Sequence, residues 1–547
     1  MHGLMMDAPL LITEIMRFAD KNYPDLEVVS VTMDNPRHRC TMRDVFRRAR
    51  QLANALQAAG VRPGDRVATL AWNDYRHYEL YYAVSCMGAV LHTINPRLFP
   101  EQLEYIINHA EDKLLFVDAT LLPAMGSLQG KMPTVEQVIV LTSDAAMPAA
   151  VAGKLQSYES FIAGHSDQFD WPDLDERQAS SLCYTSGTTG NPKGVLYTHR
   201  STVLHSFAGC TVEATGLSSN DVVLAVVPMF HANAWGLPYT APMVGTKLVF
   251  PGPKMGDPAT LVALMNEESV TMAAGVPTVW TLLLNYLDQS GVKLKSLKRT
   301  LVGGSAVPLS RIRDFEQKHG VLVLQGWGMT ETSPIGTVGT LRAGMDALPA
   351  EERHRIQALQ GHGIFGVQMK IVDDDGHELP WDGKSAGELK VRGPWVCSGY
   401  FRIDNSSSHD ADGWFATGDV ACIHPSGYLQ ITDRAKDVIK SGGEWISSVD
   451  LENCACGHPE VLMAAAIGVK HPKWEERPLL LVVPRQGCTP TRESVLAHIA
   501  EHFAKWQLPD EVILVESLPM TATGKISKKD LRAKYKDTLV EKEQAQG

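Results

Sequence analysis

Long hydrophobic runs are missing from this 547-residue sequence. Because no stretch of about 18 apolar residues occurs, no helix is expected to span a membrane. A basic leader followed by a small-residue cleavage site is also missing around Asp7 and Leu10, so no signal peptide is expected. These absences favour a cytoplasmic protein.

Metal-type cysteine spacing and an excess of positive charge are missing too. The closest of the nine cysteines, Cys454 and Cys456, form neither a CxxC motif nor part of a second pair. An odd number of scattered cysteines is typical of free thiols in a reducing compartment. A net charge of -11 argues against a nucleic-acid partner, although a local site could still bind a nucleotide.

What the sequence does contain is a long alternation of helical and strand patterns. A helical pattern over 45–60 precedes an apolar strand pattern over 66–73, and the alternation repeats over 77–90 and 113–119. This predicts an α/β fold with layered, largely parallel sheets. The length exceeds what one core supports, so at least two domains are expected.

The pattern of expected strands and helices changes in the last third of the sequence. Short strand-and-turn units follow Leu389, and about a hundred residues after Asp437 carry their own strands and helices, which suits a small α+β domain. We therefore predict a large N-terminal domain over 1–432, a connecting segment at 433–437, and a small C-terminal domain over 438–547.

The most informative segment is LCYTSGTTGNPKG at 182–194, which combines hydroxyls, glycines and one lysine between two apolar strands. Glycine amides, hydroxyls and a lysine charge together suit a phosphate. A surface turn of small residues is the alternative for an arbitrary cluster of this kind. A Walker A loop is excluded because Lys193 lies between Pro192 and Gly194, and no GxGxxG is present here.

This segment resembles the signature loop of the adenylate-forming superfamily, which includes acyl-CoA synthetases, peptide-synthetase adenylation domains and firefly-type luciferases. Later motifs follow in the family's order: GWGMTE at 326–331, GWFATGD at 413–419, DRAKD at 433–437, KSGGEWIS at 440–447 and TGKI at 523–526. Within the family the sequence is most similar to bacterial medium- and long-chain fatty acyl-CoA ligases and to 3-methylmercaptopropionate-CoA ligases. The similar stretches include 92–98 and 227–236.

The resemblance implies ATP, Mg²⁺ and coenzyme A as ligands. It implies that the β- and γ-phosphates are held by Thr185, Ser186, Gly187, Thr188, Thr189, Gly190 and Lys193, and that Glu331 and Thr185 contact the metal. It places the rest of the nucleotide near Gly303, Gly304, Ser305, Gln325, Gly326, Trp327, Thr330, Asp419, Arg434, Lys436, Lys440 and Trp445. Without the motifs, Glu331 would be interpreted as a solvated turn residue. A structural Asp419–Arg434 ion pair is compatible with ribose binding.

The same resemblance implies roles in catalysis. Lys525 would bridge the substrate carboxylate and the α-phosphate, although a lone lysine near a C-terminus is usually a solvated charge. His231 and Trp235 would border the acyl pocket, although core packing is the simpler interpretation of each in isolation. Gly442 and Gly443 would admit the pantetheine arm, and the small mobile domain would rotate about Lys436 between half-reactions.

The sequence therefore predicts an AMP-forming ligase that joins a small-molecule carboxylic acid to coenzyme A. No charged residue occurs in 227–239, so the acid should be apolar and of short to medium length. A fatty acid is the first choice and 3-methylmercaptopropionate the second. Alternatives are an enzyme that loads a carrier protein, a luciferase-like oxidase and an inactive adenylate-binding protein. A homodimer is expected, since dimers are the commonest oligomers.

Overall fold

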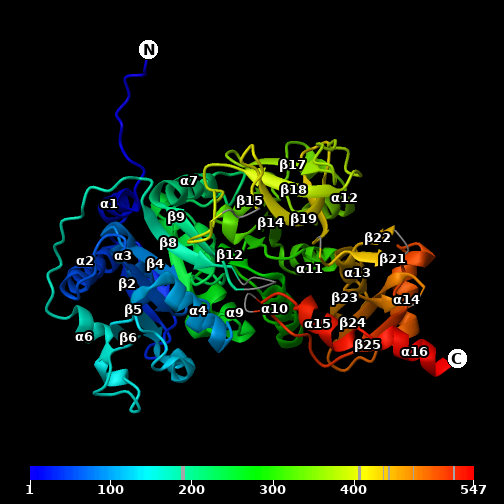
Figure 1. The fold of residues 1–547 in the computed structure, drawn as a ribbon, viewed down its shortest axis with the longest axis horizontal. Coiled ribbons are helices and arrows are strands. Elements are labelled where there is room, and N and C mark those ends of the chain that lie inside the picture. The colour runs from blue at the N-terminus through cyan, green and yellow to red at the C-terminus, as the bar shows by residue number, and fades with distance from the viewer. Residues whose placement is uncertain are drawn as a thin grey trace.

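The chain forms a large N-terminal part and a smaller C-terminal part that lie beside each other (Figure 1). In the computed structural model the described residues are 1–185, 191–404, 408–434, 436–441, 444–471, 473–521 and 524–546, without the side chains of Trp445 and of residues 543–546. We call the C-terminal part, from residue 438 onward, the lid.

The first large sheet is parallel at its centre and antiparallel at its margins. Its strands, in spatial order, are β16 (His362–Gly363), β15 (Ile335–Val338), β14 (Leu322–Gly328), β13 (Arg299–Val302), β12 (Met272–Gly275), β10 (Val222–Ala225), β11 (Lys247–Phe250), β1 (Glu27–Ser30) and β2 (His38–Thr41). The central strands are short and wholly or mostly buried, as expected for a parallel sheet covered on both faces.

The second large sheet is parallel except for one hairpin. Its order is β7 (Gln156–Ser157), β6 (Gln137–Leu141), β5 (Asp112–Asp118), β3 (Arg66–Leu70), β4 (Val90–Thr93), β8 (Ala179–Tyr184) and β9 (Gly194–Thr198). The antiparallel pair β8–β9 brackets the predicted phosphate loop, which confirms that this segment connects two strands.

Helices separate and cover these two sheets. They are α1 (Ile12–Asn22), α2 (Met42–Ala58), α3 (Tyr75–Cys86), α4 (Pro100–Ala110), α5 (Leu122–Met125), α6 (Tyr158–Ile162), α7 (His199–Cys210), α8 (Leu237–Val244), α9 (Pro258–Glu267), α10 (Pro277–Ser290), α11 (Leu309–His319) and α12 (Ala350–Gln357). One core cluster joins α1, α2 and α3 to strands of both sheets. Helices α9 to α11 cover the far face of the first sheet, and α4 and α5 that of the second.

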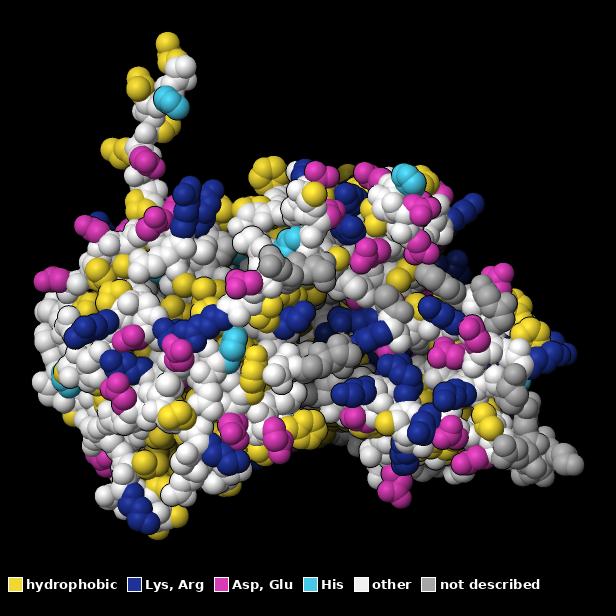
Figure 2. All heavy atoms as spheres, in the orientation of Figure 1, with side chains coloured by type: hydrophobic (Ala, Val, Ile, Leu, Met, Phe, Trp, Pro, Cys, Tyr) yellow, Lys and Arg dark blue, Asp and Glu magenta, His cyan; other side chains and the backbone are white. Residues whose placement is uncertain are grey.

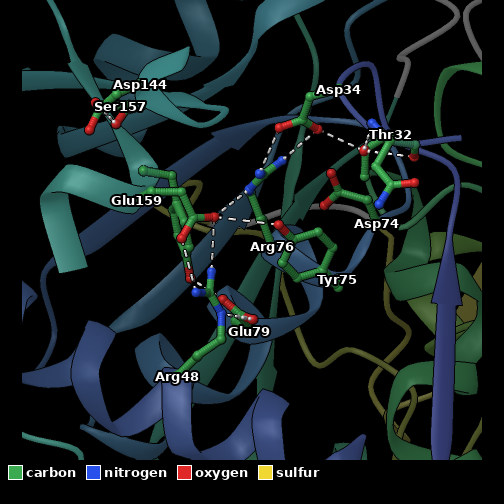
Figure 3. A network of polar contacts seen from close by, with 12 residues as sticks. Thr32, Asp34, Arg48, Asp74, Tyr75, Arg76, Glu79, Asp144, Ser157 and Glu159 are labelled. Carbon is green, nitrogen blue, oxygen red and sulfur yellow. Dashed lines mark hydrogen bonds and ion pairs between the residues drawn. The ribbon is translucent and has the colours of Figure 1, made fainter. Parts of the chain in front are cut away.

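Helix α3 is buried along its whole length, including two charged side chains. Arg76 bonds to Asp34 (3.0 Å) and Glu159 (2.9 Å), while Glu79 bonds to Arg48 (2.7 Å), which also reaches Glu159 (Figure 3). Burial raises the pKa of Asp34, but the Arg76 guanidinium outweighs it and lowers the value to about 2. Because every charge has a partner, α3 can form the middle layer without an unpaired buried ion.

A smaller sheet connects the large part to the lid. It is antiparallel throughout, with the order β17 (Gln368–Val372), β18 (Gly387–Arg392), β19 (Phe415–Ile423) and β20 (Leu429–Arg434). The short antiparallel strands confirm the strand-and-turn units expected after Leu389.

The lid has its own sheet and helices, as a small α+β domain should. The sheet order is β22 (Glu444–Ile446), β21 (Ile439–Ser441), β24 (Glu475–Pro484) and β23 (Val461–His471), and β25 (Glu511–Leu514) pairs with β24. The lid helices are α13 (Ser448–Ala455), α14 (Arg492–Ala500), α15 (Lys528–Tyr535) and α16 (Thr538–Gln546). The predicted α/β class with a small α+β lid is confirmed. None of the helices in the described part of the chain has the length and apolar character needed to cross a membrane.

Candidate active site

A cavity of about 590 Å³ lies between the large part and the lid. Its floor is formed where β10, β12, β13 and β14 of the first sheet end at their carboxyl edge, the usual location of ligand sites in parallel sheets. Lysine and arginine side chains outnumber carboxylates in its lining. The space-filling view shows Lys and Arg side chains gathered along the hollow beside the lid (Figure 2). The acidic protein therefore has a locally positive site.

The ends of the predicted phosphate loop lie in this cavity. Thr185 and Lys193 both line it, and the Thr185 amide donates to the Lys193 carbonyl at 2.8 Å. The Lys193 ammonium lies 4.8 Å from the centre of the Tyr400 ring, a cation–π contact that holds its charge at the site. Ser186, Gly187, Thr188, Thr189 and Gly190 lie outside the described residues.

Glu331 lines the same cavity and is linked to Lys193 through Tyr400, which contacts both side chains. It belongs to a short 3₁₀ turn, η6 (Thr330–Thr332), directly after β14, and only 6% of it is exposed. Tyr400 donates to its Oε1 at 2.8 Å. Burial raises the pKa of Glu331, opposed by this hydrogen bond and by the charges of Arg434 and Lys193. Among the described residues no lysine or arginine forms an ion pair with it, so the donor set fits Mg²⁺ shared with phosphate oxygens.

Asp419 and Arg434 face each other on adjacent strands. The register of β19 and β20 pairs the two residues, and Arg434 Nε lies 3.1 Å from Asp419 Oδ1. Trp327 Nε1 donates to the other oxygen, Oδ2, at 2.8 Å. The two contacts fix the orientation of the Asp419 carboxylate. Each oxygen can still accept a further hydrogen bond, for example from a ribose hydroxyl. The structural ion pair and the predicted ribose role are compatible.

The predicted adenine-side residues lie along the ends of β13 and β14. Gly303, Gly304, Ser305, Gly326, Trp327 and Thr330 all line the cavity. Gln325 does not: it is fully buried, accepts from the Val307 amide (2.8 Å) and donates to the Ala358 carbonyl (3.0 Å). Its side chain braces the loop that lines the cavity, and direct contact with a nucleotide stays a prediction.

His231 and Trp235 are presented to the cavity by an unusual turn, η4 (Ala232–Gly236). Four consecutive non-glycine residues, 232–235, have φ between 43° and 57°. Left-handed backbone costs about 1–2 kcal/mol per residue, so the turn needs external support. Asn233 supplies it by donating to Ser181 Oγ (2.9 Å) and accepting from Tyr81 (3.3 Å).

The Trp235 indole packs directly on Gly303. A Cβ added to Gly303 would lie 3.1 Å from Trp235 Cη2, closer than the ring allows without moving. The absence of a side chain at 303 therefore sets where the aromatic wall of the cavity lies. This position is consistent with the predicted acyl border.

Lys525 reaches the cavity from the lid. A Cβ at Gly304 would lie 3.2 Å from Lys525 Cε, and the Thr278 hydroxyl donates to the neighbouring Gly524 carbonyl at 3.0 Å. Burial in the cleft, with the charge of Arg434, lowers the pKa of Lys525 to about 8. Burial, aided by the charge of Lys525, lowers the pKa of His231 to about 4, so the imidazole is neutral beside the ammonium.

This pKa predicts a basic limb in the adenylation pH profile. The protonated form of Lys525 predominates below about pH 8 and is lost above it, so kcat/KM for acid-dependent pyrophosphate exchange should fall about tenfold per pH unit beyond that point. Bound anions favour the ammonium, so the limb in kcat should lie at higher pH. Exchange measured from about pH 6 to about pH 10 checks this. Lys525→Arg should remove the limb because arginine stays charged; a flat wild-type profile would contradict the assignment.

The remaining predicted residues lie where the lid begins. Lys436 lines the cavity, and burial lowers its pKa. Lys440, on β21, is exposed and is not part of the cavity lining. Gly442, Gly443 and the Trp445 side chain lie outside the described residues. Contacts of Lys440, Gly442, Gly443 and Trp445 with nucleotide or pantetheine stay predictions.

Tyr400 lines the cavity and Asn233 supports the turn beside it, but neither role was predicted from the sequence. Tyr400 is brought to the phosphate loop because the next amide, that of Phe401, donates to the Gly194 carbonyl at 2.8 Å. Tyr400 is far from Lys193 and Glu331 in sequence and has no motif of its own. For Asn233, a polar residue inside the apolar 227–239 stretch was the available signal.

The cavity brings together Thr185, Lys193, Glu331, Asp419 and Lys525, a set of hydroxyl, cationic and carboxylate groups that suits a reaction between two anions. The similarity to known proteins identifies the class of the protein. The AMP-binding enzyme family model matches residues 17–401 and that of the AMP-binding enzyme C-terminal domain matches 450–525. The chain belongs to the AMP-binding enzyme family, which confirms the predicted superfamily.

Individual relatives cover nearly the whole chain. A 3-methylmercaptopropionyl-CoA ligase of Ruegeria pomeroyi is 51% identical over 98% of this chain and 100% of its own length. A medium-chain-fatty-acid–CoA ligase of Ectopseudomonas oleovorans is 49% identical over 99% of this chain and 98% of its own. The crystal structure of the anthranilate CoA ligase AuaEII in complex with anthranoyl-AMP superimposes with a TM-score of 0.87 at 25% identity, covering 98% of this chain and 99% of that one.

Proposed function

We propose that this protein converts an apolar carboxylic acid of short to medium length, ATP and coenzyme A into an acyl-CoA, AMP and pyrophosphate. It is an acid–CoA ligase of the AMP-binding enzyme family. The observation that supports the chemistry most directly is Lys525 from the lid, placed beside Gly304 in the cavity that His231, Glu331 and Asp419 also line.

In the first half-reaction a carboxylate oxygen attacks the α-phosphorus, and the bond to the bridging oxygen breaks as pyrophosphate leaves. Both reactants are anions, so cations must offset their repulsion as charge accumulates. Lys193 serves the leaving pyrophosphate, and Lys525 bridges the carboxylate and the α-phosphate. Asp419 would hold the ribose, and Glu331 would hold the metal ion. No proton transfer is needed, which suits a neutral His231 that only positions the acyl group.

In the second half-reaction the thiol sulfur attacks the acyl carbon, the carbon–oxygen bond breaks, AMP leaves and the thiol proton passes to solvent. The lid contacts around Lys525 belong to the first half-reaction, so the lid must turn to admit the thiol. We propose that the segment 433–437 between domains 1–432 and 438–547 is the hinge, with Lys436 at its centre and Gly442 and Gly443 beside the pantetheine.

The remaining expectations belong to this proposal. Mg²⁺, held by Glu331 and Thr185 with phosphate oxygens, would neutralise phosphate charge. Cytoplasmic location is supported by nine cysteines that are all free thiols. A homodimer is supported by the exposed apolar side chains of Met5, Phe207 and Val212.

The acid is constrained by the walls of the cavity. The 227–235 segment contributes Val227, Pro228, Ala232, Trp235 and His231, with no carboxylate to pair an ammonium group. Amino acids are therefore disfavoured, because burying an unpaired charge is costly. A fatty acid is our first choice. The thioether acid 3-methylmercaptopropionate is the second candidate, favoured by the similarity to the Ruegeria pomeroyi ligase.

An acid panel tests both function and substrate. AMP and thioester are followed with butyrate, octanoate, 3-methylmercaptopropionate, coumarate and phenylalanine at saturating ATP and coenzyme A. The first three should exceed the last two in kcat/KM by at least about tenfold, since one to three kcal/mol separates fitting from misfitting apolar groups. Their ranking identifies the acid class. AMP formed without thioester, or preference for coumarate or phenylalanine, would contradict the proposal.

A further inference from the structure

The first turn of α11 contacts the lid through residues other than Lys525 and the hinge, although Arg311, Cys456 and Leu462 line the same cavity as Lys525. Ser310 Oγ donates to the Cys456 carbonyl at 3.2 Å, and Arg311 Nη2 donates to the Leu462 carbonyl at 3.2 Å. Both acceptors are backbone groups of the lid, at the end of α13 and the start of β23. A carbonyl at a helix end has no partner within its helix, so it is free to accept such a bond.

Arg311 is buried although it carries a permanent charge. Only 4% of the side chain is exposed, and its partners are Asp314 in the same helix, at 3.3 Å, and the lid carbonyl. Since Leu462 belongs to the lid, any large rotation of the lid breaks this hydrogen bond. The contact therefore exists in one lid orientation, the one in which Lys525 lies in the cavity, and favours it over others.

The charges around this contact are mixed. Burial and the charge of Arg311 lower the pKa of Arg485, a lid residue, while Asp314 and Asp288 of the large part act in the opposite direction. Repulsion between the two arginines is therefore offset in part by these carboxylates. An interface balanced in this way can open within a catalytic cycle.

The same turn continues directly from the nucleotide side of the cavity. The lining residues 303–306 run into Val307, whose amide is fixed by Gln325, and α11 starts two residues later. The position of the lid contact is thus tied to the wall of the site.

We propose that Ser310 and Arg311 are positioning residues that hold the lid in its adenylate-forming orientation and that their bonds break between the half-reactions. This inference rests on the proposed function, in which the lid takes two orientations. It predicts that loss of these bonds slows adenylate formation without slowing thioester formation, a split that a general loss of folding could not produce.

The test compares Arg311→Met, Ser310→Ala and the control Arg313→Met. Arg313 lies in the same helix but is partly exposed and pairs with Glu351 of the large part. Pyrophosphate exchange should fall about tenfold in Arg311→Met and about threefold in Ser310→Ala, the sizes expected for a charged and a neutral hydrogen bond. Thioester formation from supplied acyl-adenylate should be unchanged or faster in both, and Arg313→Met should match wild type.

Equal losses in both half-reactions, or unchanged exchange in Arg311→Met and Ser310→Ala, would overturn the inference. Thermal melting of each variant verifies folding, and Ser310→Ala keeps the test valid if Arg311→Met is unstable. Failure of the proposed function is seen separately: wild-type enzyme would then make no thioester from supplied acyl-adenylate, whatever the variants do to exchange.

Discussion

Lys525→Ala should reduce acid-dependent pyrophosphate exchange by about 10²–10³-fold, the loss expected when one preorganised charge is removed from a transition state. The lysine lies within the cleft beside the Gly303–Gly304 wall, where its charge is weakly screened. Transfer from supplied acyl-adenylate to coenzyme A should remain, because no second anion has to be brought to the phosphate in that step.

Lys534→Ala is the matched control, since Lys534 is an exposed lysine of α15 outside the cavity lining. It should leave both half-reactions unchanged. Comparable losses of exchange and transfer in Lys525→Ala would contradict the assigned role and indicate a folding defect instead.

Gly443→Leu should have the opposite profile, with exchange retained and thioester formation reduced by about 100-fold. The sequence-based reason is that a bulky side chain beside the pantetheine path would misplace the thiol, and small misplacements have effects of this size. Gly256→Leu is the control, because this position is exposed, a Cβ added to it would meet no atom within 4 Å, and its φ is ordinary.

Lys436→Pro should give a similar profile through the hinge. Proline fixes φ and restricts the residue before it, which should hinder rotation of the lid. Lys436→Ala separates this effect from the loss of charge at the cavity, and should retain more thioester formation. Loss of exchange with transfer preserved, in Gly443→Leu or Lys436→Pro, would contradict the two-orientation scheme.

Much of the fold was predictable because local patterns agree with the final packing. The helical pattern at 45–60 corresponds to α2, and the strand pattern at 113–119 to β5. The strand predicted over 66–73 ends earlier, at Leu70, because Asp74 caps α3 by accepting from the His77 amide. Why α3 is buried all round could not be predicted, since it depends on Arg48 and Asp34 arriving from other elements.

The site was predictable where chemistry is concentrated in short motifs. Thr185, Lys193, Glu331, Asp419 and Lys525 each stand in such a motif, and the fold brings all five to one cavity. The supporting contacts were not predictable, because they join segments far apart in the chain. The Tyr400–Glu331 bond and the Arg311–Leu462 contact have no local pattern. The Asn233 support of the left-handed turn was signalled only by a polar residue within an apolar stretch. Gln325 was predicted as a nucleotide-pocket residue, but its side chain supports the loop behind the cavity and does not line it.

The most direct test of the account follows the oxygen atoms of the acid. A preferred acid labelled with heavy oxygen in its carboxylate is turned over with ATP and coenzyme A, and the products are analysed by mass. If a carboxylate oxygen attacks the α-phosphorus and the thiol then cleaves the carbon–oxygen bond, one labelled oxygen must leave on the phosphate of AMP and the other remain in the thioester, with none in pyrophosphate. Label in inorganic phosphate accompanied by ADP, or AMP without label, would contradict the acyl-adenylate mechanism.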